Sequence, residues 1–86
     1  MKKFLVFKST TCGPCKMVTP IVESIKEENP DLDISIYFTD SDEGNLQAMS
    51  YGVSAVPTFI KIDEDGSMAT IVGYRPKQAL EQFFGI

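Results

Sequence analysis

The chain has 86 residues, with two cysteines, no histidine and no tryptophan. Eight basic and twelve acidic residues give a net charge of −4, which argues against nucleic acid or an anionic membrane as a partner. Without histidine there is no imidazole base, no Cys–His nucleophile pair and no histidine metal ligand. We expect one domain over residues 1–86.

The cysteine content and the length of the apolar runs indicate the compartment. Two cysteines are too few for a disulfide-rich secreted scaffold, which typically carries ~2–4 bridges. The apolar run after Lys3 is shorter than the roughly 7–15 residues of a signal peptide core, and no stretch approaches the ~20 of a transmembrane helix. We therefore expect a soluble protein of the cytosol (that of the host, if the source is viral). We also expect a monomer.

The first predicted elements are a strand over residues 3–8 and a helix from about 13 to 28. Thr11 or Cys12 is the candidate N-cap, and Pro14 suits the first turn, where its missing N–H costs nothing. Pro20 lies inside this helix and should kink it, because proline removes one backbone hydrogen bond.

A second strand over 34–38 and a short helix opening at Ser41 follow, and Gly52 is a natural stop for that helix. The residues predicted to form the apolar face of the short helix are Leu46, Ala48 and Met49. Three methionines are interpreted as core residues near the site, namely Met17, Met49 and Met68.

Strands over 58–62 and 68–72 should form a hairpin, Gly73 breaks the pattern, and a last helix covers 76–84. The order is β-α-β-α-β-β-α. A βαβ opening requires parallel pairing of its two strands, whereas the hairpin adds an antiparallel edge. The predicted fold class is α/β, with a mixed four-stranded sheet and helices on both faces.

The segment Cys12-Gly13-Pro14-Cys15 is the main chemical motif. At the start of a helix this spacing brings both sulfurs within bridging reach and sets the first thiol over unsatisfied N–H groups. Such donors favour the thiolate and lower the pKa of a first cysteine from ~8.5 to roughly 3.5–7.5. Cys12 is therefore the candidate nucleophile in thiol–disulfide exchange, and Cys15 the buried resolving thiol.

Two other interpretations of the cysteine pair stay open. The spacing also suits half a zinc site, which only an intersubunit arrangement could complete, because a closed site needs four ligands. The other alternative is an inert structural bridge, although so short a loop contributes little entropy. No metal or cofactor is expected.

Val56-Pro57-Thr58 is the second signal, because proline cannot donate to a sheet ladder and is unusual where an apolar strand opens. The simpler interpretation is an ordinary proline at a strand start, since only ~5% of X–Pro bonds are cis. The functional interpretation is a cis proline that frees the Val56 backbone to pair with an extended substrate beside Cys12.

These motifs resemble the thioredoxin family. Residues 12–17 are similar to its active-site segment, residues 51–58 resemble its cis-proline segment, and Pro20 lies where the family kinks its active-site helix. The resemblance covers nearly the whole chain and leaves out only the extra N-terminal strand and helix of full-length members. It implies a thioredoxin-like fold and a cis Pro57.

The resemblance also implies a thiol–disulfide oxidoreductase that reduces protein disulfides with electrons from a thioredoxin-reductase-type donor. Its substrates would be disulfide-containing proteins, ribonucleotide reductase among the candidates. The nucleophile would be Cys12 and the resolving thiol Cys15, joined as the redox disulfide Cys12–Cys15. The residues implied to flank substrate are Gly13, Pro14, Val56, Pro57, Gly73 and Tyr74.

The sequence departs from the family at several positions. Thr11 stands where the family usually has tryptophan, and Val6 replaces a buried aspartate whose partner lysine falls near Ile36. Because that carboxylate is thought to help deprotonate the resolving thiol, we predict a slower resolving step. Lys8 is interpreted as a solvated lysine at a strand end, and the alternative is that it raises the thiolate content of Cys12.

Two other functions remain as alternatives. The small size suggests a glutaredoxin-like or ribonucleotide-reductase-dedicated redoxin. Against glutathione, the segment after Gly73 lacks a Gly-Gly-X-Asp pattern, although Arg75 could still meet a carboxylate. The other alternative is a thiol-independent binding subunit, which would keep its function when both cysteines are replaced by serine.

Overall fold

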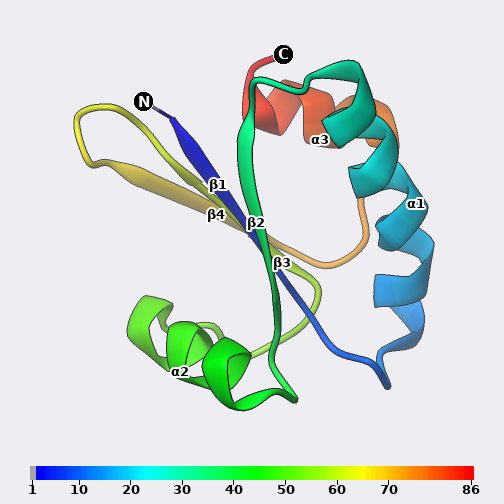
Figure 1. Cartoon of the computed structure of the whole chain (residues 1–86), viewed down its shortest axis with the longest axis vertical. Helices are drawn as coiled ribbons and strands as arrows, with labels where there is room; N and C mark the ends of the chain where they lie inside the picture. The colour runs from blue at the N-terminus through cyan, green and yellow to red at the C-terminus, as the bar shows by residue number, and fades with distance from the viewer. Residues whose placement is uncertain (1) are drawn as a thin grey trace.

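The computed structural model describes residues 2–86. Its elements, each within one residue of the prediction, are β1 (Lys3–Lys8), α1 (Gly13–Glu28), β2 (Asp33–Phe38), α2 (Asp42–Tyr51), β3 (Thr58–Ile62), β4 (Met68–Val72) and α3 (Lys77–Phe84). The β-α-β-α-β-β-α order is confirmed. Figure 1 shows the strands crossing the middle of the molecule, with α1 and α3 on one side and α2 on the other.

The four strands form one sheet in the order β2-β1-β3-β4. β1 pairs with β2 in parallel, as the βαβ opening requires, and with β3 antiparallel. β3 and β4 form the predicted antiparallel hairpin, whose turn is closed by the Gly66 N–H donating to the Asp63 carbonyl over 2.9 Å. Because β1 is an inner strand, with β2 on one side and β3 on the other, the segment that follows it starts from the middle of the sheet.

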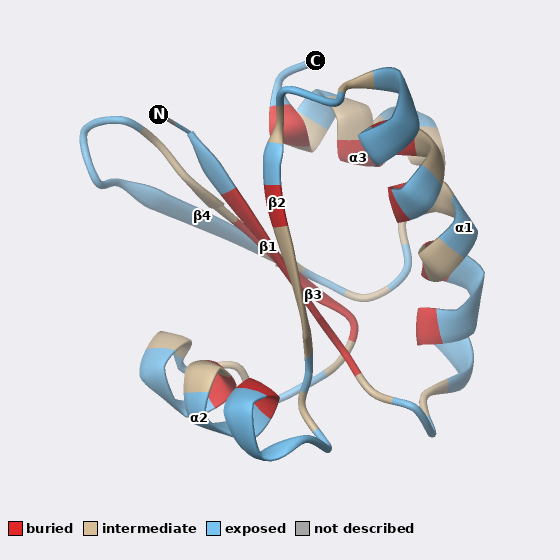
Figure 2. Ribbon diagram, viewed as in Figure 1, coloured by how far each residue is buried: buried red, intermediate tan, exposed pale blue. Residues whose placement is uncertain are grey.

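Hydrophobic residues fill both faces of the sheet. Neighbouring residues of a strand point to opposite faces, so Phe4 and Val6 pack toward α1 and α3, while Leu5 and Phe7 pack toward α2. The cluster on the side of α1 and α3 comprises Phe4, Val6, Val18, Val22, Ile25, Ile34, Phe59, Leu80 and Phe84. The cluster on the side of α2 comprises Leu5, Phe7, Ala48 and Ile60. The prediction of helices on both faces is therefore confirmed (Figure 2).

The predicted apolar face of α2 is confirmed at Ala48 and wrong at Leu46 and Met49. Leu46 is 62% exposed and Met49 is 72% exposed, whereas Gly44 and Ala48 are buried. The helix turns its two small residues to the sheet because this lets its backbone come close: a Cβ built on Gly44 would stand 1.7 Å from the Phe38 carbonyl oxygen. Larger side chains cannot occupy that space.

The other two methionines predicted as core residues are also exposed. Met17 lies on the solvent side of α1 at 58% exposure, and Met68 opens β4 at 56%. Helix α1 runs through Pro20 and ends at Asn29, its C-cap, as predicted. Helix α2 ends at Gly52, whose left-handed backbone with φ of 70° confirms the predicted stop.

Candidate active site

Cys12 and Cys15 form a disulfide at the start of α1. Of the two predicted N-cap residues, the structure selects Cys12, whose backbone is extended and whose Sγ accepts a hydrogen bond from the Cys15 N–H over 3.2 Å. Cys15 is 2% exposed, while Cys12 is half-buried. The helix N-terminus therefore directs one of its unsatisfied donors at the outer sulfur.

A contact that sequence reasoning missed fixes the loop before the cysteines. The N–H and hydroxyl of Thr10 both donate to the Asp40 carboxylate, which lies thirty positions along the chain in the connection between β2 and α2. These hydrogen bonds hold the pKa of the Asp40 carboxyl below its usual value. No local pattern could have revealed the pair, because it exists only once β1 and β2 lie side by side.

The cis-proline segment lies against the disulfide. The Val56–Pro57 peptide bond is cis, as the resemblance predicted, and Cys12 Sγ lies 3.7 Å from the Val56 carbonyl oxygen. The Thr58 hydroxyl donates to the Ala55 carbonyl over 2.6 Å and braces the turn that precedes β3. The backbone of Val56 thus borders the exposed sulfur.

The other residues predicted to flank substrate lie on the first turn of α1 and after β4. Gly13 and Pro14 are exposed on the first turn of α1. The Gly73 N–H donates to the Pro57 carbonyl over 2.8 Å, and Gly73 has a φ of 98°, which favours glycine. Tyr74 follows it and is 40% exposed.

The buried positions beneath the cysteines differ from expectation at one residue. Val6 is 1% exposed and pairs with Ile36 across β1 and β2, so the place of the family's aspartate and lysine is apolar here. Lys8 is only 8% exposed, which makes the prediction of a solvated lysine wrong. Its ammonium donates to the Thr19 hydroxyl over 2.9 Å.

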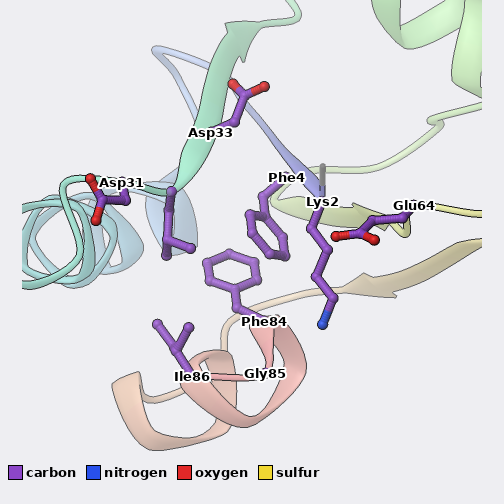
Figure 3. A pocket seen from close by; sticks show the side chains of 9 residues that line it. Lys2, Phe4, Asp31, Asp33, Glu64, Phe84, Gly85 and Ile86 are labelled. Carbon is purple, nitrogen blue, oxygen red and sulfur yellow. The ribbon is translucent and has the colours of Figure 1, made fainter.

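A cavity of about 280 Å³ lies at the other end of β1. Its lining includes Lys2, Phe4, Phe84 and Ile86 and three acidic residues, Asp31, Asp33 and Glu64 (Figure 3). Within residues 2–86, the side chains around it include none of the predicted site residues. A hollow of about 150 Å³ borders Val56 on the side of α2. Across the same residues, no group of metal-ligating side chains gathers and no helix is long and apolar enough to cross a membrane.

Comparison with known proteins agrees with this geometry. The thioredoxin family model matches residues 1–85. Thioredoxin of Listeria monocytogenes is 43% identical over 77 residues, which cover 88% of this chain and 73% of that protein. Thioredoxin of Bacillus subtilis is 37% identical over 76 residues, or 88% of this chain and 72% of the relative. Among solved structures, Fasciola hepatica thioredoxin matches with a TM-score of 0.83 at 28% identity, covering 98% of this chain and 78% of that one.

Proposed function

We propose, since the chain belongs to the thioredoxin family, that Cys12 is its nucleophile and Cys15 its resolving thiol. The chain is a thiol–disulfide oxidoreductase that reduces protein disulfides. The observation that carries the two roles is the difference between the sulfurs. Cys12 is half-buried at the helix N-cap, within reach of a substrate, whereas Cys15 is 2% exposed and can meet only the neighbouring sulfur.

The proposed exchange transfers two electrons in two displacements. The Cys12 thiolate attacks one sulfur of the substrate disulfide, a mixed disulfide forms, and the other substrate sulfur leaves as a thiolate. Cys15 then loses its proton to solvent and attacks Cys12 Sγ, which breaks the mixed disulfide and releases the second substrate thiolate. The chain is left with the Cys12–Cys15 disulfide found in the structure. Two electrons from a reductase restore the dithiol.

We propose that substrate binds along the edge formed by the cis-proline segment and the loop that follows β4. The Val56 carbonyl borders Cys12 Sγ, and an extended substrate can pair with this backbone as an added strand. The hydrogen bond between Gly73 and Pro57 holds the two sides of the edge together. The proposed substrate-flanking residues are Gly13, Pro14, Val56, Pro57, Gly73 and Tyr74.

Membership of the family implies a thioredoxin-reductase-type electron donor and disulfide-containing protein substrates in general. We propose ribonucleotide reductase as one such substrate, a reducing cytosol as the compartment, and a monomeric single domain over 1–86 as the working form. Nη1 of the Arg75 guanidinium donates to the carbonyls of Val72 and Tyr74. The match to curated thioredoxins favours the reductase-dependent function over the glutaredoxin-like one.

Insulin reduction tests the proposed function in two parallel arms. One arm supplies NADPH and thioredoxin reductase, and the other supplies glutathione and glutathione reductase. We expect turnover in the first arm, and activity confined to the glutathione arm would overturn the assignment. To test the named substrate, oxidised ribonucleotide reductase replaces insulin in the first arm and its reduction is measured.

Single cysteine variants test the roles of the two thiols. Cys15→Ser should accumulate a covalent mixed disulfide with insulin, because the first displacement proceeds and the second cannot. Cys12→Ser should form none, and mass spectrometry distinguishes the two. A double serine variant that keeps its biological function would instead favour a thiol-independent binding role.

A further inference from the structure

Lys8 ends β1, and its side chain packs between Thr19 of α1 and the Phe38 ring. It lies on the same side of the strand as Phe4 and Val6, the side that α1 covers, and it is 8% exposed. Among residues 2–86 it is the only charged side chain that is buried. Because burying an ammonium is costly unless its surroundings compensate, its partners indicate its role.

The partners of Lys8 lead to the resolving cysteine. Lys8 Nζ donates to Thr19 Oγ1 over 2.9 Å, and the same hydroxyl donates to the Cys15 carbonyl oxygen over 3.1 Å. Thr19 therefore joins the ammonium to the helical turn that carries Cys15. On its other side the ammonium faces the Phe38 ring, 5.2 Å from the ring centre, which is a favourable cation–π position.

Glu23 is the acidic side chain that offsets the positive charge of Lys8. Burial lowers the pKa of the Lys8 ammonium, and the Glu23 carboxylate on α1 opposes that effect. The Asp40 carboxylate, which lies in the connection after β2, accepts hydrogen bonds from Thr10. Val6, two positions earlier on the same side of β1, is apolar and offers no carboxylate.

We infer that Lys8 is a positioning residue for the resolving step, an inference that rests on the proposed role of Cys15. Thr19 holds the ammonium at the turn of Cys15, where a positive charge favours the thiolate over the thiol. In the second displacement, Cys15 gives its proton to solvent and its thiolate attacks Cys12 Sγ, releasing the substrate thiolate. Lys8 stabilises the attacking thiolate and neither gains nor loses a proton.

The test is the thiolate titration of the reduced, isolated protein, followed by ultraviolet absorbance across pH. Lys8→Met should raise the midpoint of the resolving thiol by roughly one pH unit, the lower end of what a nearby opposite charge contributes. Lys8→Arg keeps the charge and should titrate like the original chain. Lys26→Met is the matched control. It removes an exposed lysine of α1, the helix that carries Cys15, and should leave the midpoint unchanged.

A second variant keeps the inference testable if Lys8→Met does not fold. Thr19→Val retains the ammonium and the shape of the side chain but removes the hydroxyl that anchors it, so the midpoint should again rise. In single-turnover reduction of a model disulfide, both variants should slow release from the mixed disulfide by roughly 3–10-fold and leave the first displacement unchanged. Titration curves that coincide with those of the original chain would overturn the inference.

The titration needs no substrate or reductase, so its outcome is separate from that of the proposed function. If the original chain reduces insulin and Lys8→Met titrates unchanged, only the role of Lys8 fails. If the original chain reduces no insulin in either arm, the proposed function fails whatever Lys8 does.

Discussion

Replacing Gly44 with alanine should destabilise the protein strongly, although alanine is the better helix former. The added Cβ would stand 1.7 Å from the Phe38 carbonyl oxygen and 2.4 Å from its carbonyl carbon, both backbone atoms, where ordinary contacts lie at 3.4–4 Å. Helix α2 must therefore shift away from β2 by on the order of 1.5–2 Å, which overpacking of a close interface requires. That shift pulls Ala48 off its cluster.

The net cost follows from three terms. Overpacking costs ~1–3 kcal/mol and weakening of the cap that Ser41 provides costs ~1 kcal/mol, while the gain in helix propensity offsets ~1 kcal/mol. We expect a loss of about 1–3 kcal/mol, which corresponds to a melting temperature roughly 4–24 °C lower in a domain of this size.

Guanidinium unfolding of the oxidised protein, followed by far-ultraviolet circular dichroism, measures the effect of Gly44→Ala. This probe suits a chain without tryptophan. Gly13→Ala is the matched control, because a Cβ there meets no described atom within 4 Å. It should change stability by less than about 0.5 kcal/mol. Equal stability of the two variants would refute the close approach of α2 to the sheet.

Three further predictions concern the loops and the rate. Because Thr10 depresses the pKa of Asp40 below 3.8, the stability from this carboxylate is present above 3.8 and lost as pH falls through the folded value. Urea unfolding at stepped acid pH should thus show a steeper loss for the original chain than for Asp40→Asn, and parallel curves would contradict this. Ser41→Ala removes the cap of α2 and should cost ~1 kcal/mol in guanidinium unfolding, whereas an unchanged midpoint would show that water replaces the hydroxyl. With Val6 in place of a carboxylate, stopped-flow measurement should find attack by Cys15 slower than in a full-length thioredoxin, and matching rates would rule this out.

Features fixed by neighbouring residues could be predicted from the sequence. The N-cap at Thr11 or Cys12, the stop at Gly52 and the hairpin of 58–62 with 68–72 each depend on local backbone chemistry; the structure confirms the last two and selects Cys12 for the first. The strands were predictable for a related reason, since continuous or alternating apolar runs suit only buried or half-buried positions. The cis bond before Pro57 was predicted from the family resemblance, because proline alone favours a trans bond.

The exposed face of α2 could not be predicted from apolar periodicity. Leu46 and Met49 have the hydropathy of core residues, yet the space beneath the helix admits only Gly44 and Ala48. Two small residues spaced four apart were the available signal, because such a pair permits close packing of a helix backbone. The deciding quantity is the distance between α2 and β2, which no local pattern encodes.

Lys8 illustrates the same limit for a charged residue. A lysine at a strand end ordinarily extends its ammonium into water. Here β1 lies at the centre of the sheet and α1 covers its end, so the ammonium donates a hydrogen bond to Thr19 on the helix. Its burial thus follows from the strand order. The sequence predicted the pairing of β1 with β2, but it did not predict the pairing of β1 with β3.

The end of β2 links these tertiary contacts to the active site. The Phe38 carbonyl lies beneath Gly44 and accepts a hydrogen bond from the Ser41 hydroxyl, while the Phe38 ring faces the Lys8 ammonium. Two residues later, Asp40 fixes the loop before the cysteines. A displacement of α2 from β2 therefore acts on the ammonium near Cys15 and on the loop of Cys12 together. The thiolate titration of Gly44→Ala should shift along with its stability, because one backbone contact supports both.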